Sequence, residues 1–283
     1  MLPTIEIENV MKQLTKNAIR YLLIAFVISF SVGVIYPAKA ATLDSVSHIH
    51  HLKVVGNKIL VLTHEGLYEL VGKNEMQLVG MERIDIMGFT SLDNAFLASG
   101  HPAIGSKMPN PVGVIKSLDG GLTWKAISLS GKVDFHFLEG ARRDLYGADA
   151  QTGNLMHSAD SGVTWKTLGT NTFRDIAVSP KKSGAAIAIK DSELHLTQNA
   201  FKSTIKIKNT LQFSQIEWGK SGLYGLSGSS LYRSKNSGKT WTMQSKFEGT
   251  PGILSVSDQL MLVTVDSGIY ISKNGGKSFK KFS

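Results

Sequence analysis

Apolar residues are distributed in two different ways along this chain of 283 residues. One continuous apolar run occupies 21–36, whereas beyond residue 41 the apolar residues form short segments separated by glycine, asparagine and aspartate. Helical periodicity is nearly absent from this second part. A representative stretch divides into four segments of β type, at 133–139, 144–148, 154–158 and 164–168. The pattern predicts an N-terminal apolar segment followed by an all-β region.

A turn motif recurs in the β-rich region with the pattern Ser-x-Asp/Asn-x-Gly-x-Thr/Ser-aromatic. Its four copies are 117–124, 158–165, 234–241 and 272–279. A degenerate copy at 197–204 has Phe201 in place of the glycine. The motif resembles the Asp-box of sialidase-like propellers. Because an aspartate or asparagine can accept backbone N–H groups in a tight turn, we expect structural roles for Asp119, Asp160, Asn236 and Asn274.

The five motif copies, together with the segment 66–70, which matches the strand before each motif but has no motif after it, define six repeating units. Equivalent positions are Leu70, Ser117, Ser158, Thr197, Ser234 and Ser272, with separations of 47, 41, 39, 37 and 38 residues. This interval is close to the ~40–45 residues of a four-stranded propeller blade, and a closed ring of blades protects the sheet edges. The sequence therefore predicts a six-bladed β-propeller over residues 41–283. Because the last unit has its own fourth strand, at 278–282, we expect whole blades to close the ring.

The N-terminal region has the features of an export signal. Basic residues between positions 12 and 20 precede the apolar run at 21–36, and a small-residue pattern follows at 38–40. We interpret 1–40 as a hydrophobic signal helix, a signal peptide cleaved after Ala40. An uncleaved anchor is the alternative, because tilt and bilayer thinning can accommodate a short apolar segment. Either interpretation places the protein outside the cytoplasm, secreted or associated with the cell surface.

Composition and charge narrow the functional classes. The chain has no cysteine, which excludes disulfides and thiolate metal sites, so any metal ligand must be histidine, aspartate or glutamate. Without residues 1–40 the chain has 27 Lys+Arg against 20 Asp+Glu, a formal charge of +7. The lysines are spread over the repeats, and no arginine-rich strip is present in the sequence. Nucleic-acid binding is therefore not expected.

The candidate binding residues are those that the strand scheme places at one mouth of the central channel. They either begin an inner strand or end a second strand: His48, His50, His64, His101, Asp134 and His136. A divalent metal is the expected cofactor if there is one, with His48, His50 and His136 as ligands and Asp134 as a ligand or an orienting acceptor. The alternative is that these residues line the channel without binding a ligand. His51, His157 and His195 are expected to pack or to lie on the surface.

A family resemblance extends over residues 45–283. The segments 48–50, 64–67, 87–89, 99–102, 110–113 and 134–136 resemble secreted, glycosylhydrolase-like (sialidase-like) Asp-box or BNR-repeat propellers of bacteria. The resemblance implies the propeller fold and the alternative function of a glycoside hydrolase acting on cell-wall or environmental glycan. A fold does not determine a reaction, so the family name alone does not establish the activity.

Sialidase chemistry is not supported by the distribution of arginines. Only Arg83 and Arg174 are expected near the candidate face, whereas sialidases use three arginines to bind the substrate carboxylate. Hydrolysis of other glycosides requires two convergent carboxyl groups. Asp134, Asp149 and Glu217 are weak catalytic candidates by position, together with Asp85 and Asp175, and no pair stands out.

Three functions remain open at this point. The first is an exported propeller that binds a glycan, a metal or a partner protein at the His-rich face, and the second is the glycoside hydrolase. The third is a platform for protein assembly, similar to photosystem-assembly or sortilin-type propellers. Contact with a membrane is expected only through an uncleaved N-terminal segment.

Overall fold

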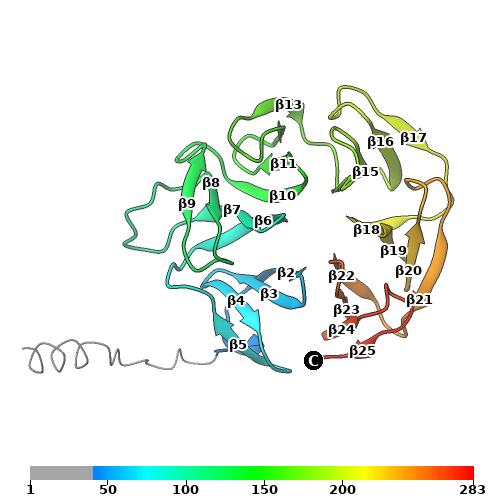
Figure 1. Ribbon diagram of the computed structural model, residues 1–283, viewed down its shortest axis with the longest axis horizontal. Coiled ribbons are helices and arrows are strands. Elements are labelled where there is room, and N and C mark those ends of the chain that lie inside the picture. Colours follow the sequence, from blue (N-terminus) through cyan, green and yellow to red (C-terminus); the bar gives the residue numbers. More distant parts are fainter. Residues whose placement is uncertain (1–40) are drawn as a thin grey trace, which may run out of the picture. The chain divides into compact units, whose positions relative to one another are not determined.

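Six antiparallel sheets are arranged radially in the computed structural model, which describes residues 41–283 (Figure 1). The six-bladed, all-β propeller predicted from the repeat spacing is confirmed. The predicted signal segment, residues 1–40, lies outside the described residues. Within 41–283, no helix has the length and apolar character needed to cross a membrane.

Each sheet forms one blade, and the chain completes one blade before it enters the next. The first three blades contain β1 (Ala41–Thr42), β2 (Ile49–Val55), β3 (Lys58–Thr63), β4 (Gly66–Leu70) and β5 (Glu75–Leu78); β6 (Asp85–Leu92), β7 (Ala95–His101), β8 (Val114–Ser117) and β9 (Lys125–Ser128); and β10 (Phe135–Ala141), β11 (Asp144–Asp149), β12 (Asn154–Ser158) and β13 (Lys166–Thr170). A short 3-10 helix, η1 (Leu43–Ser45), follows β1.

The last three blades have four strands each. They contain β14 (Asp175–Val178), β15 (Ala186–Lys190), β16 (Glu193–Thr197) and β17 (Ile205–Ile207); β18 (Phe213–Gly219), β19 (Gly222–Ser227), β20 (Ser230–Ser234) and β21 (Thr242–Lys246); and β22 (Pro251–Val256), β23 (Met261–Val265), β24 (Gly268–Ser272) and β25 (Lys280–Lys281). The final strand is shorter than the predicted 278–282. Strand order is sequential except in the first blade, where β1 pairs with the outer edge of β5.

The hydrophobic core lies between neighbouring blades. Leu60 and Leu62 of the first blade pack against Ile86 and Phe89 of the second, and similar clusters fill the other blade junctions. The ring closes in the same way, because Leu52 and Val54 of β2 share a cluster with Leu262 of β23. Outer strands contribute little to this core, and every residue of β13 is exposed. The first strand of each blade is therefore fixed by its neighbours and faces the central channel (Figure 1).

The recurring turns are held by their own side chains. In the second of them, Asp160 Oδ1 accepts hydrogen bonds from the Thr164 amide at 2.9 Å and from the Ser158 hydroxyl at 2.8 Å. Ser158 Oγ in turn accepts the Gly162 amide at 2.9 Å. The hydrogen bonds from Thr164 lower the pKa of Asp160 to about 2. In the degenerate turn, Phe201 takes the place of glycine with φ +59° and packs its ring against Tyr146.

Replacing Asp160 with alanine is expected to lower the free energy of unfolding by ~1–2 kcal/mol, because the Thr164 and Ser158 donors lose their shared acceptor. Chemical denaturation would measure the change. Asp160→Asn is the matched control, since Asn236 and Asn274 make the same amide contacts in their own turns. Unchanged stability of the alanine variant would contradict the structural role.

Candidate functional site

Three positions recur at the start of the first blades and bring polar side chains to the same mouth of the channel. The first position immediately precedes the first apolar residue of the inner strand. It is His48 in the first blade, Asp85 in the second and Asp134 in the third. The end of the second strand of the hairpin lies beside it: His64 directly follows β3 in the first blade, and His101 is the last residue of β7 in the second. Because neighbouring blades pack side by side, side chains from adjacent blades meet at this mouth of the channel.

The third position is a β-bulge in the inner strand. The register of β2 shifts around His50, and the register of β10 shifts around His136, so each histidine is an extra residue without a ladder partner. A bulge redirects a side chain away from the regular alternation of the strand. In the second blade the corresponding residue is Met87, whose thioether offers no imidazole nitrogen to a metal. His50 and His136 are therefore equivalent residues two blades apart.

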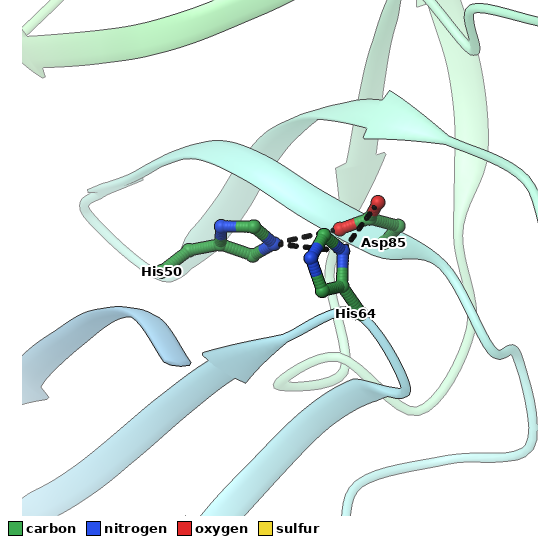
Figure 2. A group of neighbouring side chains, drawn as sticks. All are labelled: His50, His64 and Asp85. Carbon is green, nitrogen blue, oxygen red and sulfur yellow. Dashed lines mark hydrogen bonds and ion pairs between the residues drawn. The ribbon is translucent and has the colours of Figure 1, made fainter. Parts of the chain in front are cut away.

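The first group consists of His50, His64 and Asp85, which point toward one another from three segments of two blades (Figure 2). His50 Nε2 lies 3.2 Å from His64 Nδ1 and 2.9 Å from Asp85 Oδ1. His64 Nδ1 lies 2.9 Å from Asp85 Oδ2. Two ring nitrogens and both oxygens of one carboxylate thus face a common point at the junction of the first and second blades.

The three side chains of the first group differ in their exposure to solvent. The His50 side chain is 7% exposed, whereas that of His64 is 46% exposed. Burial lowers the pKa of His50, although hydrogen bonding to Asp85 opposes this effect. The ring of His48 lies beside the group, with its centroid 4.9 Å from that of His50, and is exposed. The group is therefore buried at His50 and exposed to solvent at His64.

The second group consists of His101, Asp134 and His136 at the junction of the second and third blades. Asp134 Oδ2 lies 3.2 Å from His101 Nε2 and 2.9 Å from His136 Nε2. His101 Nδ1 makes a further hydrogen bond of 2.8 Å with Asn110 Oδ1. The two groups are neighbours, because Asp85 of the first and His101 of the second are partners across the β6–β7 ladder.

Each group has the composition of a two-histidine, one-carboxylate metal site. Ligand atoms about 2.0–2.2 Å from a metal lie about 3 Å apart when they occupy neighbouring positions. The separations of 2.9–3.2 Å in both groups fall in this range. Three protein ligands leave further coordination positions for water or for a ligand, as in catalytic zinc sites and non-haem iron sites.

The structure distributes the residues expected to bind a metal differently from the sequence-based hypothesis. That hypothesis combined His48, His50 and His136 in one ligand set, whereas His136 lies with His101 and Asp134. His48 is adjacent to the first group and makes only ring contacts with it. Asp85 was considered only as a catalytic carboxylate. Its equivalence to Asp134, each preceding the apolar residue that starts its inner strand, is the signal that could have identified it.

Of the weak catalytic candidates, Asp149 is buried and engaged in local structure. Its carboxylate accepts the Asp134 amide at 3.0 Å and the Thr152 hydroxyl at 2.6 Å. Burial would raise the pKa of Asp149, but the hydrogen bonds from Thr152 and from the Asp134 amide outweigh burial and lower it. Asp149 thus fixes the backbone that carries Asp134.

Glu217, the third candidate, lines the central channel with residues from three other blades. Two adjoining cavities of about 370 and 390 Å³ share Lys53, Glu139 and Asp175, and the first also contains Glu217. Lys53 forms an ion pair with Glu139, and Glu217 Oε2 is buried without a hydrogen-bond partner among the described residues. Burial raises the pKa of Asp175 to about 7 and that of Glu217 to about 8.

Three arginines that could have formed a carboxylate-binding clamp make separate contacts. Arg83 donates to the Tyr68 hydroxyl at 3.2 Å, and Arg174 lines the second cavity. Arg233 bonds the Ser221 carbonyl. These contacts give no three-arginine clamp among the described residues. His51 lines the second cavity too, and burial lowers its pKa to about 4.

Solved structures with the same fold include three propellers. YCF48 bound to a D1 peptide has a TM-score of 0.52 and 14% identity, and the match covers 88% of this chain and 85% of that one. PorZ, a bacterial surface component of the type-IX secretion system of Porphyromonas gingivalis, has a TM-score of 0.57, 11% identity and coverage of 86% and 34%. The GH74 enzyme of Niastella koreensis has a TM-score of 0.56, 12% identity and coverage of 83% and 37%.

These similarities support a β-propeller and nothing finer, because identities of 11–14% show a common fold only. The chain spans about a third of the length of PorZ and of the GH74 enzyme. No protein-family model matches the sequence, and no curated protein does either.

Proposed function

We propose that the protein is an exported, ligand-binding β-propeller, and that a divalent metal ion held by His50, His64 and Asp85 is the binding element at its His-rich mouth. The convergence of these three side chains carries the proposal (Figure 2). Neutral imidazole and carboxylate together suit zinc, iron or manganese. Burial of His50 favours the neutral form that binds metal.

The open side of the group determines what the ion can do. His64 and His48 are exposed, so a ligand can approach the ion from solvent. The ion would serve as a point of attachment for an oxygen or nitrogen atom of a glycan or of a partner protein. YCF48, a propeller of similar fold, is known with a bound peptide, which supports a protein partner.

The motif repeats support an assignment to the sialidase-like Asp-box propellers. The sequence features of residues 1–40 support export, and PorZ is an example of a surface component with this fold. Sialidase activity is not part of the proposal, because Arg83, Arg174 and Arg233 have separate contacts. Glycoside hydrolysis is the alternative function, since the GH74 enzyme has a similar fold, and its candidate carboxyl groups are Glu217 and Asp175 of the channel cavity.

Replacing Asp85 with asparagine is expected to weaken Zn²⁺ binding at the first group at least tenfold, because the carboxylate ligand that faces both histidines is lost. The measurement is calorimetric titration of the full chain with Zn²⁺ after treatment with a chelator. Asp93→Asn is the control, since Asp93 lies at the other end of the same β6–β7 hairpin. Equal Zn²⁺ affinity of wild type and Asp85→Asn would rule out the proposed site.

A further inference from the structure

We propose that His101, Asp134 and His136 form a second divalent-cation site, separate from the first group, and that Asn110 positions its ligand His101. Asn110 lies in the rim loop, residues 102–113 between β7 and β8. The inference goes beyond the proposed function, which requires only the first group. It rests on three observations: a buried carboxylate with an unused oxygen, a ring nitrogen with a fixed role, and a rigid backbone.

The carboxylate of Asp134 is the first observation. Asp134 is 5% exposed, and its Oδ1 atom is buried without a hydrogen-bond partner among the described residues. Its Oδ2 atom faces both histidines of the group. A buried carboxylate oxygen without a partner is unfavourable unless a hydrogen bond or a cation compensates it. A metal bound by both oxygens of Asp134 would use the unpaired atom.

The tautomer of His101 is the second observation. The Oδ1 atom of Asn110 can only accept a hydrogen bond, so His101 Nδ1 at 2.8 Å is the donor. In neutral His101, the Nε2 atom then has a lone pair, and this lone pair faces Asp134 Oδ2 at 3.2 Å. Two electron-rich atoms in this position repel each other unless a cation lies between them. The same arrangement, an outer acceptor that orients a histidine, is common around protein metal sites.

The backbone that holds Asp134 is the third observation. The Asp134 amide donates to Asp149 Oδ1 at 3.0 Å, and the Asp134 carbonyl accepts the Ala150 amide at 2.8 Å. The next amide, of Phe135, donates to Ser99 Oγ at 3.0 Å. Phe135 itself is fully buried. Asp134 is therefore held in place by its own blade and by the second blade, and its carboxylate is arranged before any ion binds.

The two groups use no common ligand. Each has its own carboxylate and its own pair of histidines, although the groups are neighbours through the Asp85–His101 pair of the β6–β7 ladder. Two ions should consequently bind, each lost independently of the other. Of the two sites, the rim loop contacts the second: Asn110 bonds the ligand His101, and the Val112 amide bonds the carbonyl of Gly100, the residue before His101, at 3.0 Å.

The test uses the full chain, stripped with a chelator and titrated with Zn²⁺, and measures the number of bound ions and the affinity of each. Wild type should bind two ions, and His136→Ala and Asp85→Asn one each. The double variant should bind none. His136 is 45% exposed, so its replacement leaves the core intact. His195→Ala, on β16 and outside both groups, is the control and should bind two.

Asn110→Ala provides a second readout that a purely structural role would not give. Zn²⁺ affinity should fall 10–100-fold at the second site and remain unchanged at the first, because outer acceptors have effects of about this size. If His136→Ala and Asn110→Ala both leave Zn²⁺ binding unchanged, the second site is wrong whatever the first group does. If only Asp85→Asn leaves binding unchanged, the proposed function fails and the second site remains.

Discussion

Replacing Gly100 with alanine is expected to lower the free energy of unfolding by about 2–5 kcal/mol and to weaken cation binding at both groups. A Cβ atom at this position would lie 2.0 Å from the Asp85 carbonyl oxygen and 3.0 Å from the Met87 amide nitrogen, both backbone atoms. The φ of Gly100 is +148°, a conformation that alanine adopts with strain. The β6 backbone must move, and Asp85 moves with it.

The same displacement reaches the second group through the next residue. Gly100 precedes His101, and its carbonyl accepts the Val112 amide that ends the rim loop. Chemical denaturation and Zn²⁺ titration of the full chain would measure the two effects. Gly105→Ala is the matched control, because Gly105 also has a positive φ and no atom lies within 4 Å of its added Cβ. A Gly100 variant that is no less stable than the Gly105 variant would contradict the close approach.

The fold could be predicted because its signals are local. In each turn, an aspartate or asparagine satisfies the amide four residues later, so the motif is visible in one short window of sequence. Five such windows mark five of the blades, and the strand at 66–70, which resembles the strand before each motif, marks the sixth. The fifth strand of the first blade was not predicted, because β1 has two residues and joins β5 from a distant part of the chain.

The candidate site was predicted only in part, because its geometry depends on bulges and on the pairing of blades. The sequence placed His50, His64, His101, Asp134 and His136 near the channel mouth. Neither the shift of register at His50 nor that at His136 has a marker such as glycine. Without the bulges, the ligand sets could not be divided between two junctions. Asn110 was missed because its role depends on how the rim loop folds back onto His101.

The central channel contains a cluster of ionisable residues that is separate from the two histidine groups. Lys53, Glu139, Asp175 and Glu217 come from four inner strands, and a single ammonium group faces three carboxyl groups. Burial would lower the pKa of Lys53, but the negative charges of Glu139 and Glu217 raise it, so the lysine stays charged. Lys53 and Glu139 form an ion pair. Asp175 and Glu217 have no such ion pair within residues 41–283, so burial raises their pKa values.

The direction of the resulting pH dependence follows from the raised pKa of Asp175. In the unfolded chain the carboxyl group ionises near pH 3.8, whereas burial holds its pKa near 7 in the folded protein. Between these values the folded state binds more protons, so stability decreases as the pH rises. Its contribution is fully present below about pH 4 and is lost as the pH passes through 7. The ionisable groups that interact with Asp175 from other inner strands are Glu139, Lys53 and Glu217.

Asp175→Asn is accordingly expected to raise the free energy of unfolding by about 2–4 kcal/mol at pH 8.5 and by much less at pH 4.5. The amide oxygen can still accept the Ile216 amide, which bonds Asp175 Oδ2 at 2.7 Å. The hydrogen bond from the Ile176 amide to Oδ1, at 2.9 Å, is lost at both pH values, so the difference between the two pH values reports the removal of the charge. Urea denaturation at the two pH values measures the difference. Asp258→Asn is the control: Asp258 pairs with Lys220 at the exposed rim, and its loss should change stability by less than about 1 kcal/mol at either pH. Equal effects of Asp175→Asn at both pH values would show that the channel does not keep this carboxyl group protonated.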